Sequence, residues 1–255
     1  MNKHDNIWRI WDNEKEYGER FVKRIKGELP EMESSKALAK TLKDEVNEYN
    51  KILDVGCGTG HYLASLLKAI DHPFSYTGVD ATRYYVDLAI DTWKGIFDDA
   101  KFVQGDIFNL PFEDNSFDVV YCCNVLLHLP SVEIPLKELT RVANRLIIVR
   151  SLFSDRSFRV MDVHKSNNEE YLEFDINGQP KSFHYYNIYS KDYINDILKK
   201  SKVNNVEFKE DTNFNANAIQ KEFELFESSD QTHMLDGYQV NGCIIQPWHF
   251  LKIKL

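Results

Sequence analysis

The sequence has few of the features that would link it to a metal or to an oxidising compartment. Only four of its 255 residues are cysteine, and no two of them form a CxxC pair. Because structural zinc sites usually draw on such closely spaced pairs, we expect no metal centre. Disulfides are rare in a reducing cytoplasm, which is where a chain with so few cysteines is expected to reside.

Long apolar runs and an excess of positive charge are also lacking. No stretch approaches the roughly 18 apolar residues of a membrane-spanning helix, and the first 20 residues have no apolar core like that of a signal peptide. Lys and Arg total 31 against 40 Asp and Glu, for a formal net charge of −9. Phosphate backbones and anionic membranes would repel such a chain. Nucleic acid and membrane are therefore not expected partners.

Short apolar runs do occur, and they alternate with stretches in which apolar residues recur at helical spacing. This alternation is typical of βαβ crossovers, in which helices cover both faces of a parallel sheet. We therefore expect an α/β fold with a Rossmann-like, doubly wound, mostly parallel sheet of seven strands. The expected strands are residues 51–55, 75–80, 101–106, 117–125, 145–152, 206–210 and a last one within 243–255.

Three parts of the chain lie outside this alternation. Residues 1–50 are expected to form an N-terminal helical cap. Residues 153–189, after the fifth strand, are rich in aromatic side chains without a clear period, and residues 212–240, between strands six and seven, are also irregular. Loops of this length in a compact domain are usually functional or disordered, and aromatic richness argues against disorder. We expect one domain, residues 1–255, whose cap and two insertions form a substrate lid.

The most informative segment is Asp54–Gly60 (DVGCGTG), which lies between an expected strand and an expected helix. Glycine permits positive φ angles and lets a ligand approach the backbone, and the helix behind it presents unpaired N–H groups. In open α/β sheets, ligands bind at this end of the strands. The dinucleotide fingerprint GxGxxG would need glycine where the chain has His61, and Asp54 would repel a pyrophosphate.

This segment resembles motif I of the class I S-adenosylmethionine-dependent methyltransferases, which reads roughly DxGCGTG. The stretch Leu110–Asp118 (LPFEDNSFD) resembles the LPFxDxSFDxV stretch of the same family. The likeness covers residues 50–150 well and residues 185–210 more loosely. It implies S-adenosylmethionine as cofactor and methyl transfer to oxygen, nitrogen or carbon of a small-molecule acceptor by in-line displacement.

The resemblance also implies which residues bind the cofactor. Asp80, at the end of the second strand, would accept hydrogen bonds from both ribose hydroxyls. Asp106, after the third strand, would accept one from the adenine amino group, and Ile107 would pack on the adenine ring. Asn124, after the fourth strand, would line the methionine part. The full expected set is Asp54, Gly56, Cys57, Gly58, Gly60, Asp80, Ala81, Asp106, Ile107 and Asn124.

Five further residues are candidates for contact with the acceptor. His128 is the candidate general base, because an unperturbed histidine pKa near 6.5 suits removal of a proton from a hydroxyl or amine. It could equally contact the cofactor or only pack locally. Trp11 and Tyr17 are candidate aromatic contacts, and Arg156 and His184 could bind an acidic group. These four could instead belong to the core or to the solvated surface.

Two other functions remain open. A nicotinamide-dependent oxidoreductase also places an acidic residue where Asp80 lies, although His61 and Asp54 count against it. A module that binds the cofactor or a partner protein without turnover is compatible too, because methyl transfer requires few obligatory catalytic residues.

Overall fold

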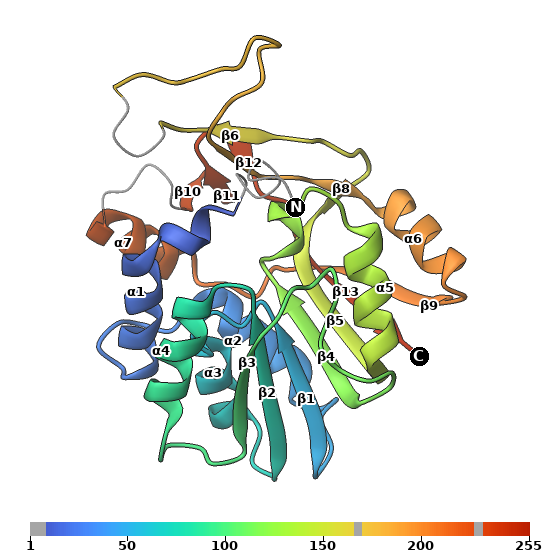
Figure 1. The fold of residues 1–255 in the computed structure, drawn as a ribbon. Helices are drawn as coiled ribbons and strands as arrows, with labels where there is room; N and C mark the ends of the chain where they lie inside the picture. Colours follow the sequence, from blue (N-terminus) through green and yellow to red (C-terminus); the bar gives the residue numbers. More distant parts are fainter. Residues whose placement is uncertain (1–8, 166–169, 227–231) are drawn as a thin grey trace.

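The structure is a computed structural model that describes residues 9–165, 170–226 and 232–255. Its main sheet follows the order β3-β2-β1-β4-β5-β13-β9, and helices cover both faces (Figure 1). All neighbouring pairs are parallel except those made by β13, which is antiparallel to both β5 and β9. The strands are β1 (Asn50–Val55), β2 (Phe74–Asp80), β3 (Ala100–Gln104), β4 (Phe117–Cys123), β5 (Ala143–Ser154), β9 (Asn205–Glu210) and β13 (Trp248–Lys254).

This strand order confirms the doubly wound α/β fold expected from the sequence. Successive strands are added on one side of β1 up to β3 and then on its other side from β4 onward, so the strand order reverses between β1 and β4. Two strands end earlier than expected. β3 stops at Gln104 because the chain turns back at once, with the amide of Asn109 donating to the carbonyl of Asp106 at 2.9 Å. β4 stops at Cys123 because Asn124 takes a left-handed φ of 60°. Both changes leave Asp106 and Asn124 in loops at the carboxyl edge of the sheet.

The core has two halves, one on each face of the sheet. Neighbouring residues of a strand point to opposite faces, so Leu53 and Ile147 join one apolar cluster while Ile52 and Ile148 join the other. This double burial explains why the strands read as nearly continuous apolar runs. The helices that contribute to these clusters are α2 (Glu33–Leu42), α3 (His61–Ala69) and α4 (Arg83–Trp93) on one face, and α5 (Glu133–Val142) and α6 (Lys191–Lys200) on the other.

The two insertions contain short strands that the sequence did not predict. Each strand is two to four residues long, which is too short for an alternating pattern to show. They comprise β6 (Met161–Val163), β7 (Phe183–Tyr185) and β8 (Tyr189–Ser190) in the first insertion, and β10 (His233–Leu235), β11 (Tyr238–Asn241) and β12 (Ile244–Ile245) in and after the second. β8 pairs with the end of β5, and in Figure 1 the other short strands lie beyond that end of the main sheet.

The remaining helices are η1 (Ile10–Asn13) and α1 (Lys15–Ile25) before the sheet, η2 (Leu126–His128) after β4, and α7 (Ala216–Phe226) in the second insertion. Among the residues that the structure describes, no helix combines the length and the apolar character needed to cross a membrane.

A single buried cation connects four strands at the carboxyl edge. Arg150 on β5 donates from Nε to Asp211 after β9 at 2.7 Å, and from Nη1 to Asn124 after β4 at 2.6 Å. Its guanidinium lies 4.0 Å from the ring centroid of Trp248, the first residue of β13. The side chains of Arg150 and Asp211 are only 4% and 1% exposed. Because a charge at this depth requires its counter-charge, the geometry of this edge depends on the pair.

Replacing Asp211 by Asn should therefore destabilise the protein strongly. The guanidinium of Arg150 would stay buried without a counter-charge, which costs about 3–5 kcal/mol in comparable cases. Asp114→Asn is the matched control, because that carboxylate pairs with Arg141 but is 70% exposed, and such pairs contribute about 0–1 kcal/mol. Urea unfolding measures both changes. Equal, small losses would show that the Arg150–Asp211 pair does not hold this edge together.

Candidate functional site

A cavity of about 520 Å³ opens at the carboxyl edge of the sheet. This volume lies within the range of small-molecule sites. Its inner wall comes from the turn between β1 and α3 and from the ends of β2 and β4, and its cover comes from α1 and both insertions. Seven of the ten expected cofactor residues line it, namely Gly56, Gly58, Asp80, Ala81, Asp106, Ile107 and Asn124.

The turn after β1 requires glycine both for its conformation and for space. Gly56 and Gly60 have φ angles of 79° each, in the region that other residues rarely adopt. A Cβ on Gly60 would lie 2.7 Å from Nε1 of Trp93 and 2.8 Å from Cε1 of Phe102. The close packing of this turn against α4 and β3 brings the backbone amides of the turn to the cavity wall.

Asp80 is held at the end of β2 by two backbone amides. Its Oδ2 accepts from the amide of Gly58 and its Oδ1 from the amide of Thr82, each at 2.8 Å. Burial raises the pKa of Asp80, and the two amide hydrogen bonds oppose that rise. Each carboxylate oxygen has a second lone pair, so the group can still accept from two ligand hydroxyls. Asp80 is thus fixed in orientation before any ligand binds.

Asp54, Cys57 and Gly60 do not line the cavity. Asp54 is 2% exposed, and its Oδ2 accepts hydrogen bonds from the phenols of Tyr76 at 2.6 Å and Tyr121 at 2.9 Å. Burial raises the pKa of Asp54 to about 7, against the opposing effect of both phenols. Burial likewise raises the pKa of the Cys57 thiol. These three residues support the turn from beneath instead of facing a ligand.

His128 lines the cavity from η2, after β4. Its Nδ1 is 2.8 Å from the carbonyl oxygen of Tyr185, and a carbonyl can only accept, so Nδ1 carries the proton and Nε2 the lone pair. Burial lowers the pKa of His128 to about 4. The rings of Trp11 and Tyr186 lie 5.2 and 5.7 Å from its ring, centroid to centroid. His128 is therefore neutral near pH 7 and enclosed by aromatic side chains.

Three of the four expected acceptor contacts line the cavity. Trp11 and Tyr17 reach it from the cap, with ring centroids 5.1 Å apart, and His184 reaches it from β7. Arg156 does not. It is exposed, its carbonyl accepts from Ser154 Oγ at 2.7 Å, and its guanidinium lies 5.9 Å from the ring of exposed Phe158. The expectation that Arg156 binds the acceptor finds no support in its position.

Arg24 is a buried cation of the cavity wall that was not expected from the sequence. Its side chain is 7% exposed, Nη1 donates to the carbonyl of Pro30 at 2.6 Å, and Nη2 pairs with Glu222 of α7. Its Nε has no hydrogen-bond partner within the described ranges. His61 lies beside it, and burial first and Arg24 second lower the His61 pKa to about 3. Arg24 follows Phe21 by three residues and so shares the buried face of α1. That spacing was the available signal.

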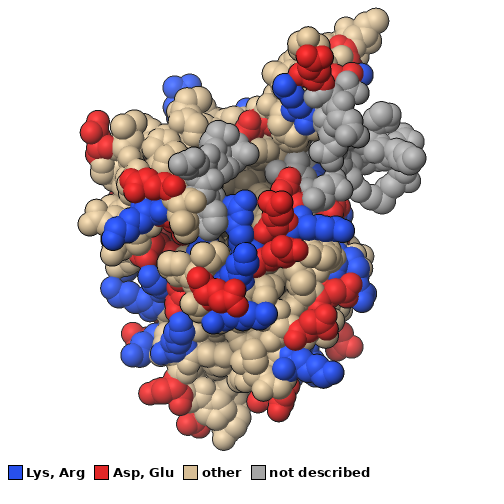
Figure 2. Space-filling model, turned by 90° about the vertical axis from the view of Figure 1, so that its left-hand side faces the viewer, with Lys and Arg blue, Asp and Glu red and all other residues tan. Residues whose placement is uncertain are grey.

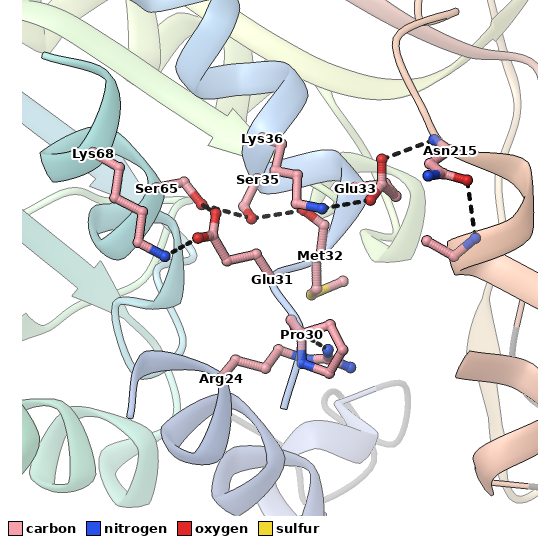
Figure 3. A network of polar contacts seen from close by, with 11 residues as sticks. Arg24, Pro30, Glu31, Met32, Glu33, Ser35, Lys36, Ser65, Lys68 and Asn215 are labelled. Atoms are coloured by element: carbon pink, nitrogen blue, oxygen red, sulfur yellow. Dashed lines mark hydrogen bonds and ion pairs between the residues drawn. The ribbon is translucent and has the colours of Figure 1, made fainter. Parts of the chain in front are cut away.

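Polar contacts fix the cap to the core and to the second insertion (Figure 3). The hydroxyl of Ser65 on α3 lies 2.9 Å from both Glu31 Oε2 and Ser35 Oγ of the cap. Glu33 at the start of α2 accepts from the amide of Asn215, just before α7, at 2.8 Å. Two segments far apart in the sequence therefore cover the cavity together.

A doubly wound sheet with a glycine turn after β1 and a fixed carboxylate after β2 defines a class of proteins that bind nucleotide-like cofactors. Comparison with known proteins indicates which members of this class the chain resembles. Residues 52–145 match a family model described as a methyltransferase domain. This stretch is therefore similar to a methyltransferase domain, and it contains the glycine turn, Asp80 and the loops after β3 and β4.

Individual relatives agree with this assignment. The chain is 40% identical to a sterol 24-C-methyltransferase of Gibberella zeae over 94 residues. This stretch covers 36% of this chain and 24% of that protein. Over 97 residues the chain is 37% identical to the demethylmenaquinone methyltransferase of Staphylococcus aureus, which is 38% of this chain and 40% of that protein. The matches thus span less than half the length of these curated relatives.

Solved structures share the fold over a longer stretch. Phosphoethanolamine N-methyltransferase 2 of Haemonchus contortus, solved with S-adenosyl-L-methionine, has a TM-score of 0.60 and 15% identity, over 97% of this chain and 59% of that one. The [4+2]-cyclase SpnF has a TM-score of 0.57 and 17% identity, over 86% and 79%. At these identities the likeness shows the fold alone, and one fold can support more than one reaction.

Replacing Gly60 by Ala should destabilise the protein more than replacing Gly95. Both glycines have positive φ, at 79° and 75°, but a Cβ on Gly95 would meet nothing within 4 Å. The backbone cost of roughly 1–2 kcal/mol is common to both variants, whereas overpacking against Trp93 and Phe102 adds about 1–3 kcal/mol for Gly60 alone. Urea unfolding of the two variants measures the difference. Equal losses would contradict the packing role of Gly60.

Proposed function

We propose that this protein transfers the methyl group of S-adenosylmethionine to a small-molecule acceptor. The carrying observation is that one cavity contains the glycine turn, the fixed carboxylate of Asp80 and the loops after β3 and β4, all within the matched methyltransferase domain. The cofactor supplies a methyl group on a positively charged sulfur, which is already a good leaving group. The task left to the protein is to bind, orient and exclude water.

Each part of the cofactor has a matching part of the cavity wall. Asp80 would accept from the ribose hydroxyls, while Ile107 would pack on the adenine ring and Asp106 would accept from its amino group. The Oδ1 atom of Asp106 already accepts from the amide of Phe108 at 3.0 Å, which orients the carboxylate. Asn124, held by Arg150, would line the methionine part. We add Arg24 as the partner of the methionine carboxylate, because it is a buried cation in this wall.

Orientation is the main contribution that the chain can make to the reaction. Holding the acceptor atom in line with the methyl group can lower the barrier by roughly 7–11 kcal/mol. We propose that the cap and the two insertions form the lid that excludes water, since residues from all three line the cavity. Trp11, Tyr17 and His184 would contact the acceptor from this lid.

A small acceptor is favoured over a polymer. One cavity of about 520 Å³ has to hold both cofactor and acceptor. On the face that carries α1, α4 and α7, acidic and basic side chains are intermingled (Figure 2). Such a mixed surface gives no field of one sign to attract a polyanion. A cytoplasmic location also remains a proposal, supported by four cysteines that are all free.

A nicotinamide cofactor is disfavoured by the position of His61. Its ring stacks on Phe21 at 3.9 Å between centroids, with an interplanar angle of 6°. A dinucleotide turn needs glycine at this position so that helix and strand pack closely. Here the imidazole and the cap fill that space.

Calorimetric titration with S-adenosylhomocysteine and, separately, with NAD tests the cofactor. We expect micromolar binding of S-adenosylhomocysteine and none of NAD. Binding of NAD alone would replace the proposal with an oxidoreductase. No binding of either would favour a module that works without this cofactor.

Asp80→Ala should weaken S-adenosylhomocysteine binding tenfold or more. Hydrogen bonds to a charged group contribute about 1.5–3 kcal/mol each, and about 1.4 kcal/mol is a factor of ten in affinity. Asp87→Ala is the control, because this carboxylate lies on the exposed face of α4 and pairs with Arg83. The same titration measures both variants, and unchanged affinity in Asp80→Ala would show that Asp80 is not the ribose ligand.

A further inference from the structure

A second imidazole lies next to His128, and it has a carboxylate partner. The ring of His184 on β7 is 6.0 Å from that of His128, centroid to centroid. Its Nε2 is 3.6 Å from Oδ2 of Asp162, directly opposite in the β6–β7 register. Both residues line the cavity. The His184 side chain is 14% exposed and that of Asp162 is 46% exposed, so the pair connects the cavity with solvent.

The pair is better suited than His128 to remove a proton. A base with a pKa of about 4, as burial gives His128, has little driving force to take a proton from a hydroxyl. A carboxylate at ion-pair distance favours the charged form of an imidazole, and Asp162 provides this for His184. Among the described residues, other titratable rings near His184 are those of His128, His164 at 5.7 Å and Tyr186 at 6.4 Å, between ring centroids.

The surroundings of the pair also limit the shape of the acceptor. Trp11, Tyr186 and Trp248 line this part of the cavity together with Leu127. Flat aromatic walls favour a flat aromatic ligand through offset or edge-on ring contacts.

We infer that His184 is the general base of the proposed methyl transfer, that Asp162 positions it and stabilises the imidazolium that forms, and that the acceptor is a small phenol. This inference rests on the proposed function. As the acceptor oxygen bonds to the methyl carbon, the carbon–sulfur bond of the cofactor breaks and its electron pair stays on sulfur. The phenolic proton passes to His184 and then to solvent past Asp162. The products are an aryl methyl ether, S-adenosylhomocysteine and one proton.

The probe is 4-nitrophenol, whose absorbance reports its own ionisation. It is titrated over pH in the presence of saturating S-adenosylhomocysteine, with wild type, His184→Gln, Asp162→Asn and His164→Gln. The last variant is the matched control, because His164 lies near His184 but does not line the cavity. We expect wild type and His164→Gln to lower the pKa of bound nitrophenol by about one unit, because the imidazolium formed when His184 takes the phenolic proton stabilises the phenolate. His184→Gln should abolish this shift and Asp162→Asn should reduce it.

The outcomes separate this inference from the proposed function. Failure of wild type to bind S-adenosylhomocysteine would overturn the proposed function itself. Intact binding with no nitrophenol uptake would overturn the phenol class of acceptor. The same shift in wild type and His184→Gln would overturn His184 as the base. The Asp162 side chain is 46% exposed, so Asp162→Asn is expected to fold. This variant can therefore test the role of the pair even if His184→Gln unfolds.

Discussion

The carboxyl edge of this sheet depends on the burial of one guanidinium. Arg150 cannot stay at 4% exposure without its partners, and its partners begin or follow three other strands. Satisfying that charge therefore fixes where β4 ends, where the chain leaves β9 and where β13 begins. Asn124 has a left-handed backbone conformation, and the hydrogen bond from Arg150 to its side-chain oxygen stabilises that conformation. The floor of the cavity is thus set by an electrostatic requirement as well as by apolar packing.

The cover of the cavity comes from segments that lie farther apart in the sequence than those that form its floor. Glycine turn, Asp80 and the loops after β3 and β4 all come from the matched domain, whereas α1, β7 and α7 come from outside it. The match to the family model agrees with this division, because it ends at residue 145. The part of the cavity proposed to hold the cofactor thus comes from the stretch that matches the methyltransferase domain. The part proposed to hold the acceptor comes from segments outside that match, so substrate choice would be decided there.

The sequence predicted the sheet well because strands buried on both faces leave a strong apolar signal. The positions of Asp80, Asp106 and Asn124 followed from the expected strands, since Asp80 ends β2 and the other two residues come shortly after β3 and β4. The motif predicted that Asp54 would bind the cofactor, but its carboxylate instead accepts hydrogen bonds from two buried phenols. A motif does not specify the direction in which a side chain points. Arg156 was predicted to contact the acceptor because it is cationic, but it is exposed. Residue type alone does not distinguish an exposed cation from a buried one. Arg150 with Asp211 and His184 with Asp162 form only through long-range pairing, which no local pattern encodes.

The contact between Arg24 and Glu222 joins residues 198 positions apart. A ribosome adding 5–20 residues per second needs roughly 10–40 s to make that stretch. During this interval α1 can already pack on α4, where Tyr85 donates to the carbonyl of Glu14 at 2.7 Å, but α7 does not yet exist. The cap therefore exists, and can pack on the core, well before the helix that pairs with it has been made. The contact between α1 and α7 is a late event in the synthesis of each molecule, set by the pace of translation.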